Sequence, residues 1–332
     1  MKKIIELKTI EAHTCGEPAR IIVEGMPQIK GNTMLEKQQY MKENLDQFRT
    51  AITAEPRGHR DMFSAVITDP CSQEADFGAI FFSSGFYENM SVHAMICICT
   101  AAVNERWLNV KEPETVIKVD TCSGMITVHV EVSGGRAGKV TMRNVPAFIY
   151  SENQVVHTDA FGDITGDVIY GGASLFQIDA DKLGIPIDPE HSEDLIDIAM
   201  DVLGHKDELE FRHPELPIDT VDYILFHSAN TKSPDSVGIN CIMLGERQLD
   251  RSPSGTTGRT GYLYLKGKIG LNETTIHENL LGMTYTGTAV EETTVGDFPA
   301  VVAEISGRAY ITGRCDFIID EDDPMGYGFR LK

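Results

Sequence analysis

Two serines stand where a hydroxyl group could take part in chemistry: Ser91 in the stretch NMSVHA and Ser254 in the stretch SPSGTTGR. Each opens a run of small and apolar residues that is typical of a buried helix, and serine is favoured just before a helix begins. The helix dipole would stabilise an anion there by only about 1 kcal/mol, sometimes about 2, which corresponds to roughly one to two pKa units. A serine hydroxyl therefore needs a neighbouring base before it can lose its proton near neutral pH.

His93 is the base nearest to Ser91 in the sequence. Side chains two residues apart on a helix point in different directions, so we expect the His93 ring not to reach the Ser91 hydroxyl. Simpler roles are also open for these residues. Both serines can be ordinary helix caps, His93 can be a hydrogen-bonded histidine on a buried helix, and Asp250 can form a salt bridge with Arg251.

The cysteine and histidine patterns do not indicate a disulfide framework or a metal site. The seven cysteines are odd in number and scattered along the chain. Cys97 and Cys99 lie two apart on an expected helix, and we interpret them as small buried side chains rather than metal ligands. His59 and Asp61 are too few to form a site and are better explained by a turn that their side chains stabilise. The sequence therefore predicts no metal.

Strand-like segments rich in Val, Ile and Thr occur in both halves of the chain. They cover residues 115–120, 125–131, 139–142, 223–226, 300–305 and 309–312. The doublet Gly134-Gly135 predicts a hairpin. Helices are expected over residues 91–104, 254–266, 34–49 and 192–203. Residues 206–219, which include Pro214 and Pro217, are expected to form a loop.

One theme occurs twice along the chain: strands, a buried helix that begins at a serine, and further strands. Ser91 and Ser254 lie about half the chain length apart. This repetition favours two lobes with a boundary between Val145 and Val168.

Several blocks of the sequence resemble the proline racemase family, which includes hydroxyproline epimerases. DRSPSGTTGRTG (250–261) is similar to the family signature DRSPCGTGT, and NMSVHA (89–94) is similar to its MCGH block. Ser254 and Ser91 stand in place of the two cysteines, and Val92 stands in place of a glycine. Further similar blocks, in the family's order, are EAHTCGEPAR (11–20), EPRGHRDMFSAVITDP (55–70), YGGA (170–173) and the tail 290–329. The chain is therefore identified as a member of this family.

The resemblance implies an α+β fold like that of diaminopimelate epimerase. In such a fold two pseudo-symmetric lobes each place a strongly curved, mostly antiparallel sheet around a central helix. We expect an N-terminal lobe over residues 1–150, onto which the C-terminal tail may fold back, and a C-terminal lobe over residues 151–332. The active-site cleft is expected between the lobes.

The resemblance also implies roles for individual residues. Ser91 and Ser254 would be the catalytic pair, facing opposite sides of the α-carbon of a bound imino acid. Backbone N–H groups at a helix start can hold a carboxylate, and an Asp suits a secondary ammonium group. The resemblance implies that Val92, Gly255 and Thr256 supply such N–H donors. It also implies that His93 and Asp250 contact the ring of the substrate or its amine. No cofactor is implied.

Three explanations of the serines stay open. They could be engineered replacements that trap a ligand, or a natural variant with altered chemistry, such as an elimination that needs only one base. The chain could also bind an imino acid without converting it. Val92 and the rearranged TTGR after Ser254 favour natural variation. Cys15 is a third candidate thiol, although a small residue in a tight turn is the simpler interpretation.

The composition narrows the choice of partners. The chain has 50 acidic and 29 basic residues and a formal net charge of −21, which repels the phosphates of nucleic acids. Glu6, Lys8 and Glu11 interrupt the apolar start of the sequence, so it is predicted to form a strand rather than a signal or membrane segment. We expect a cytoplasmic protein without a membrane partner. Its partner would be proline or a hydroxyproline, and its assembly a homodimer.

Overall fold

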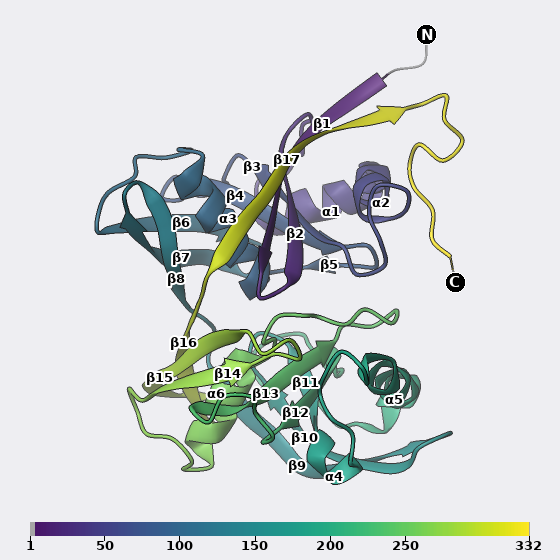
Figure 1. The fold of residues 1–332 in the computed structure, drawn as a ribbon, viewed down its shortest axis with the longest axis vertical. Coiled ribbons are helices and arrows are strands. Elements are labelled where there is room, and N and C mark those ends of the chain that lie inside the picture. The colour runs from purple at the N-terminus through teal and green to yellow at the C-terminus, as the bar shows by residue number, and fades with distance from the viewer. Residues whose placement is uncertain (1–3, 332) are drawn as a thin grey trace. The chain divides into compact units, whose positions relative to one another are not determined.

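The computed structural model describes residues 4–331, which contacts between residues divide into two units. The first unit contains the residues up to Met142 together with those from Gly307 onward, and the second contains residues 143–306. Residues 143–150 thus group with the second unit, and the residues from Gly307 onward group with the first. Strands dominate both units (Figure 1).

The first unit is organised around the two ends of the chain. Strands β1 (Ile4–Thr14) and β2 (Glu17–Glu24) form an antiparallel hairpin. The other edge of β1 pairs antiparallel with β17 (Ala309–Asp320), from Ile4 opposite Asp320 to Thr14 opposite Ala309. The C-terminal strand therefore completes the N-terminal unit, and Figure 1 shows β1 and β17 running side by side.

The remaining strands of this unit follow in chain order. They are β3 (Phe63–Thr68), β4 (Phe77–Ser83), β5 (Tyr87–Glu88), β6 (Glu114–Thr121), β7 (Gly124–Ser133) and β8 (Arg136–Arg143). The strands expected over 115–120, 125–131 and 139–142 are confirmed. The expected hairpin is confirmed as well, because Ser133 pairs with Arg136 and both intervening glycines have positive φ.

The helix expected over residues 34–49 is wrong as a single element. Helix α1 (Met34–Asn44) ends at Leu45, whose φ of −132° leaves the helical region, and α2 (Asp46–Thr53) begins directly afterwards. The buried Leu45 side chain accounts for the break, because the chain turns there to place it in the core. Helix α3 (Val92–Asn104) is confirmed, and all its residues from His93 to Val103 are buried.

The second unit has the same balance of strands and helices. Its strands are β9 (Ala147–Thr158), β10 (Gly162–Tyr170), β11 (Ser174–Asp179), β12 (Tyr223–Ser228), β13 (Ser236–Met243), β14 (Thr274–Glu278), β15 (Thr284–Val295) and β16 (Phe298–Gly307). Its helices are α4 (Ala180–Leu183), α5 (Ser192–Gly204) and α6 (Thr256–Leu265). The strands expected over 223–226, 300–305 and 309–312 and the helix over 192–203 are confirmed. Residues 206–219 form the expected loop apart from one 3-10 turn, Lys206–Glu208.

Most paired strands of the described chain run antiparallel. Parallel pairing joins β2 to β3, β4 to β6, β11 to β12 and β13 to β14. Helix α3 packs against β1, β2 and β17, and α6 packs against β9 and β15. Each unit thus surrounds one helix with curved, mainly antiparallel strands, which confirms the expected α+β fold class.

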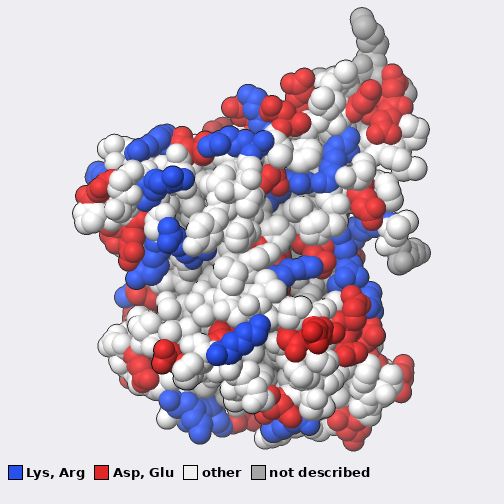
Figure 2. Space-filling model, in the orientation of Figure 1, with Lys and Arg blue, Asp and Glu red and all other residues white. Residues whose placement is uncertain are grey.

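The exterior carries much of the acidic charge. Asp and Glu side chains gather where β17 ends, at the exposed residues Glu321, Asp322 and Asp323 (Figure 2). Over residues 4–331, no helix has the length and apolar character needed to cross a membrane.

Candidate functional site

Ser91 and His93 lie close together at the start of α3. Ser91 precedes the helix with extended backbone angles, φ −134° and ψ 123°, and its side chain makes no capping hydrogen bond. Its Oγ lies 3.1 Å from Nδ1 of His93. The expectation that the two side chains diverge is wrong, because the two-residue rule applies within a helix and Ser91 lies outside it.

The His93 ring is held by its surroundings. The residue is 5% exposed, and its ring meets Phe63 of β3 edge-on, with 4.4 Å between the ring centroids. Ser91 is 6% exposed. A hydroxyl and an imidazole at hydrogen-bond distance in a buried, packed setting form the arrangement that activates a serine oxygen.

The start of α3 also offers backbone N–H groups. The first hydrogen bond of the helix runs from the Met95 N–H to the Ser91 C=O, at 2.9 Å. The Val92 N–H precedes that bond and lies outside the helical ladder, as the first N–H groups of any helix do. Val92 therefore has the geometry expected of an anion-binding donor.

Ser254 lies one residue further from the start of α6 than Ser91 lies from the start of α3. The residue before α6 is Gly255, which has φ +73°, and the helix begins at Thr256. The prediction that Ser254 itself caps this helix is wrong, because a left-handed residue intervenes. A Cβ atom at position 255 would come within 2.9 Å of Leu225 Cδ1, so both the conformation and the space favour glycine.

The Ser254 hydroxyl accepts a backbone hydrogen bond. Its Oγ lies 2.9 Å from the N–H of Ile242 in β13, which donates to it. Because one lone pair of Oγ is used in this way, the hydroxyl is oriented and keeps its own proton to donate.

Asp250 ties the same loop to β13. It is 4% exposed, its N–H donates to the Ile242 C=O at 3.0 Å, and its Oδ1 accepts the Ser252 N–H at 2.7 Å. Both backbone groups of Ile242 in β13 thus hold the loop that carries Ser254. The Ile242 C=O accepts from Asp250, and the Ile242 N–H donates to Ser254. The proposed salt bridge between Asp250 and Arg251 stays a prediction.

Thr256 provides the second helix start. Its hydroxyl donates to the Pro253 C=O at 2.5 Å. The first hydrogen bond of α6 runs from the Arg259 N–H to the Gly255 C=O, so the Thr256 N–H lies outside the helical ladder.

The YGGA block packs closely against the backbone of α6. A Cβ atom on Gly171 would come within 2.5 Å of the Gly258 backbone nitrogen. Only glycine allows the turn between β10 and β11 to approach the helix this closely.

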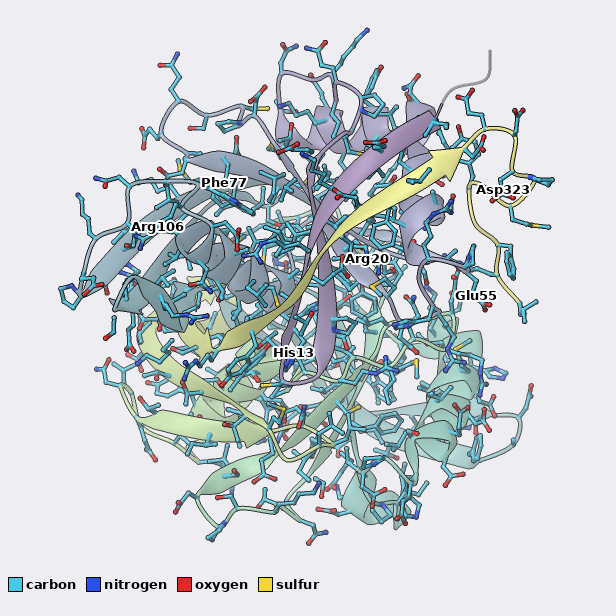
Figure 3. The ribbon with its side chains drawn as sticks, turned by 45° about the horizontal axis from the view of Figure 1, so that its top comes forward. His13, Arg20, Glu55, Phe77, Arg106 and Asp323 are labelled. Carbon is cyan, nitrogen blue, oxygen red and sulfur yellow. The ribbon has the colours of Figure 1, made fainter. Side chains whose placement is uncertain are left out.

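Two of the other motif blocks connect parts of the first unit. Arg20, labelled in Figure 3, reaches from β2 and donates through Nη1 to the C=O groups of Ile52 and Arg57. Glu55, also labelled there, exchanges two backbone hydrogen bonds with Phe329 of the C-terminal tail, at 3.1 and 2.8 Å. These hydrogen bonds connect β2 and the C-terminal tail to α2 and to the segment that follows it.

The cysteines take mainly structural places. Cys15 is buried in the two-residue turn between β1 and β2, with φ +53°, which fits the tight-turn interpretation. Cys97 and Cys99 are fully buried in α3, as predicted, and burial raises the pKa of both thiols well above the usual value. The Glu17 carboxylate and the Cys15 thiol raise the pKa of Cys97 further.

One group of potential metal ligands occurs among residues 4–331: Asp159, Asp201 and His205. The Asp201 carboxylate already accepts the N–H groups of Asp159 and Ala160, at 3.1 and 2.8 Å, and so fixes the loop after β9. His59 Nδ1 accepts the Asp61 N–H at 3.2 Å, which is the stabilised turn expected for that pair.

The candidate residues thus form two groups. Ser91, Val92 and His93 lie together in the first unit, and Asp250, Ser254, Gly255 and Thr256 lie together in the second. Sequence reasoning missed two contributors, Phe63 and Ile242. Phe63 lies within one of the quoted blocks and could have been singled out. Ile242 acts through its backbone N–H, which leaves no trace in the side-chain pattern.

Comparison with known proteins matches nearly the whole chain to one family. The family model described as Proline racemase matches residues 9–330. A proline racemase of Clostridioides difficile is 42% identical over the full length of both chains. A trans-3-hydroxy-L-proline dehydratase of Azospirillum brasilense is 38% identical, and a 3-hydroxyproline 2-epimerase of Burkholderia multivorans is 37% identical, each again over both full lengths.

Solved structures agree with these matches. A hydroxyproline epimerase from Agrobacterium vitis, with bound trans-4-OH-L-proline, superposes with a TM-score of 0.89 at 25% identity and covers 98% of this chain and 95% of that one. A methylitaconate-delta-isomerase shares the fold alone, with a TM-score of 0.55 at 13% identity over 99% of this chain and 98% of that one.

Proposed function

Because the chain belongs to the proline racemase family, we propose that it removes the α-proton of proline or a hydroxyproline without a cofactor. The observation that carries this proposal is the 3.1 Å separation of Ser91 Oγ and His93 Nδ1 at the start of the buried helix α3. The pair supplies the base that a serine lacks on its own.

The first step uses the Ser91 end. The Ser91 hydroxyl passes its proton to Nδ1 of His93 as its oxygen takes the proton from the α-carbon, so the imidazole becomes protonated and the substrate becomes a carbanion. The backbone N–H groups of Val92 and Thr256 are proposed to bind the substrate carboxylate, onto which the negative charge spreads. Asp250 is proposed to bind the ammonium group through a charge-assisted hydrogen bond.

The second step uses the Ser254 end. Ser254 donates its proton to the opposite face of the α-carbon, which inverts the centre and gives racemisation of proline or epimerisation of a hydroxyproline. Ser254 then regains a proton from solvent, and the protonated His93 releases one. The hydrogen bond from the Ile242 N–H withdraws charge from Oγ and supports this proton donation. Both serines act on the same substrate molecule in this proposal.

A second reaction, dehydration of a 3-hydroxyproline, is favoured by the difference between the two serines. Among the described residues, the Ser91 hydroxyl has an imidazole neighbour, whereas the Ser254 hydroxyl accepts a backbone N–H, and an elimination needs only one base. The C–H bond at the α-carbon and the C–O bond at C3 would break, a double bond would form between these carbons, and the hydroxyl would leave as water after taking the Ser254 proton. A dehydratase and an epimerase for 3-hydroxyprolines both occur among the similar proteins.

Incubation in deuterated water tests the function and separates these reactions. L-Proline, trans-4-hydroxy-L-proline and trans-3-hydroxy-L-proline are supplied one at a time, and recovered material is analysed by mass spectrometry and chiral chromatography. Deuterium at the α-carbon with inversion supports racemisation or epimerisation, and loss of water from the 3-hydroxy compound supports dehydration. Binding in calorimetry without exchange or elimination would leave only an imino-acid-binding role, and absence of all three signals would refute the proposal.

Two properties of the whole protein belong to the same proposal. We propose a cytoplasmic enzyme that assembles as a homodimer, the commonest form of symmetric oligomer. Light scattering after size-exclusion chromatography distinguishes a mass of two chains, which is expected, from a mass of one.

A further inference from the structure

A cavity of about 400 Å³ lies in the second unit, away from the residues described above. It is bordered by the end of β11, by α4, by β12 and β13 and by the middle of α6, all labelled in Figure 1. The lining residues that matter here are Asp179, Asp181, His227, Val237, Arg259 and Leu263.

The cavity is separated from Ser254 along the strands. Leu225 of β12 pairs with Ile242 of β13, and these two residues contact Gly255 and Ser254. The cavity instead meets His227 and Ser228, the first of which lies two residues further along β12, which corresponds to about 7 Å of extended chain. The cavity therefore lies beyond the other end of the same strand pair.

Arg259 gives the cavity its chemical character. The residue is 7% exposed and lies one turn into α6, with its guanidinium carbon 5.1 Å from the centre of the Tyr262 ring. Nη1 donates to Gln177 Oε1 at 2.8 Å, and Nε is buried without an acceptor among the described residues. The described part of the chain supplies no carboxylate in ion-pair contact with this guanidinium.

A buried guanidinium without a carboxylate in ion-pair contact is a costly feature in a folded protein, which the more distant charges of Asp179 and Asp167 offset only in part. Burial lowers the pKa of Arg259 to about 10, so the side chain is still cationic at neutral pH. Nη2 donates to no described residue and is not among the fully buried nitrogens, so it remains for an acceptor in the cavity. A carboxylate can accept such a charge-assisted hydrogen bond.

The other lining residues limit the charge of the ligand. Burial lowers the pKa of His227 to about 3, so this neighbour adds no positive charge at neutral pH. Asp181 is an ionised acceptor that already receives hydrogen bonds from Ser228, Ala229 and Asn230. Lys268 also lines the cavity, and the carboxylates of Asp179 and Asp181 offset the charges of Arg259 and Lys268, so the lining does not favour an anion of more than one charge.

The apolar lining residues suit a short hydrocarbon body. Val237, Leu263 and Ile269 border the cavity together with the charged groups. Binding sites for small molecules commonly combine such an apolar wall with one or two oriented polar groups.

We propose that this cavity is a second binding site, for a small aliphatic monocarboxylate whose carboxylate is bound by Arg259. The site is distinct from the reaction proposed for the serines, because no side chain that lines it contacts the hydroxyl of Ser91 or Ser254.

Calorimetric titration with isobutyrate tests the site on the full chain. We expect one molecule bound per chain, and we expect Arg259→Gln to weaken binding at least about tenfold, since a charge-assisted hydrogen bond is lost. Val237→Trp places a bulky ring at the partly exposed border of the cavity and should weaken binding to a similar degree, and it keeps the test informative where Arg259→Gln disturbs folding. Ser254→Ala is the matched control and should leave isobutyrate affinity unchanged.

Other results would overturn the proposal. These are an absence of isobutyrate binding to the wild type, unchanged affinity in both Arg259→Gln and Val237→Trp, or loss of binding in Ser254→Ala, which would place the probe at the serine. Inorganic phosphate that binds as tightly as isobutyrate would contradict the monocarboxylate class. Val237→Trp should retain α-proton exchange with proline, so failure of this site and failure of the proposed enzyme activity are distinguished.

Discussion

The two serines lie near the starts of α3 and α6 but have different hydrogen-bonding environments. Ser91 directly precedes α3, with an imidazole nitrogen 3.1 Å from its oxygen. Ser254 is separated from α6 by the left-handed Gly255, and its oxygen accepts a backbone N–H at 2.9 Å. One hydroxyl has a neighbour that can take its proton, and the other has a neighbour that strengthens it as a donor.

This difference separates the roles that a symmetric pair of thiols would share. A thiol ionises readily enough for either partner to act as base or acid, whereas a serine acts as a base only with help. The chain is therefore expected to abstract the α-proton at the Ser91 end and to return a proton, or to protonate a leaving group, at the Ser254 end. The following variants test that assignment.

Removing the Ser91 hydroxyl should have the largest effect. Ser91→Ala deletes the atom that takes the α-proton, and deuterium exchange at the α-carbon should fall by about 10²–10⁴-fold, the range for a positioned acid–base group. Ser64→Ala is the control, because the Ser64 hydroxyl is buried in β3 without a hydrogen-bond partner among the described residues. A Ser91→Ala protein that exchanges at the wild-type rate would remove Ser91 from the reaction.

Removing the His93 imidazole should have the second-largest effect. His93→Asn keeps a polar group of smaller size but no strong base, and exchange should fall by about 10²-fold. The same substitution in a Ser91→Cys background should cost much less, because a thiol at a helix start ionises without an added base. An equal loss in both backgrounds would mean that His93 binds substrate and does not serve Ser91.

Removing the Ser254 hydroxyl should separate exchange from inversion. Ser254→Ala should lower α-proton exchange by only about tenfold, while inversion at the α-carbon is lost with the donor on that face. Chiral chromatography of the recovered substrate measures the second effect. Retained inversion would assign the returning proton to another group.

The smallest effect is expected for the backbone before α6. Gly255→Ala places a side chain in a left-handed conformation at a cost of about 1–2 kcal/mol, so the free energy of unfolding measured in urea should fall by that amount. Gly204→Ala is the matched control, since no atom lies within 4 Å of its added Cβ. Equal stability of the two variants would contradict the strain assigned to position 255.

The sequence predicted the helices and the motif blocks well, because burial patterns and turn residues are local properties. It failed where one residue left the expected backbone region. The helix expected over residues 34–49 is interrupted at Leu45. Gly255 separates Ser254 from α6, and the extended backbone of Ser91 turns its hydroxyl toward His93. It also could not find the Ile242 N–H, since a backbone donor is the same for every residue except proline.

The tautomer of His93 is the most direct test of the account. With 15N-labelled histidine, two-dimensional NMR distinguishes a ring protonated at Nε2 from one protonated at Nδ1. If His93 serves as the base for Ser91, the ring is neutral, carries its proton on Nε2 and accepts from Ser91 at Nδ1, and its Nδ1 signal shifts in Ser91→Ala. A neutral ring protonated at Nδ1 would contradict this role, because that nitrogen could then not take the proton of Ser91.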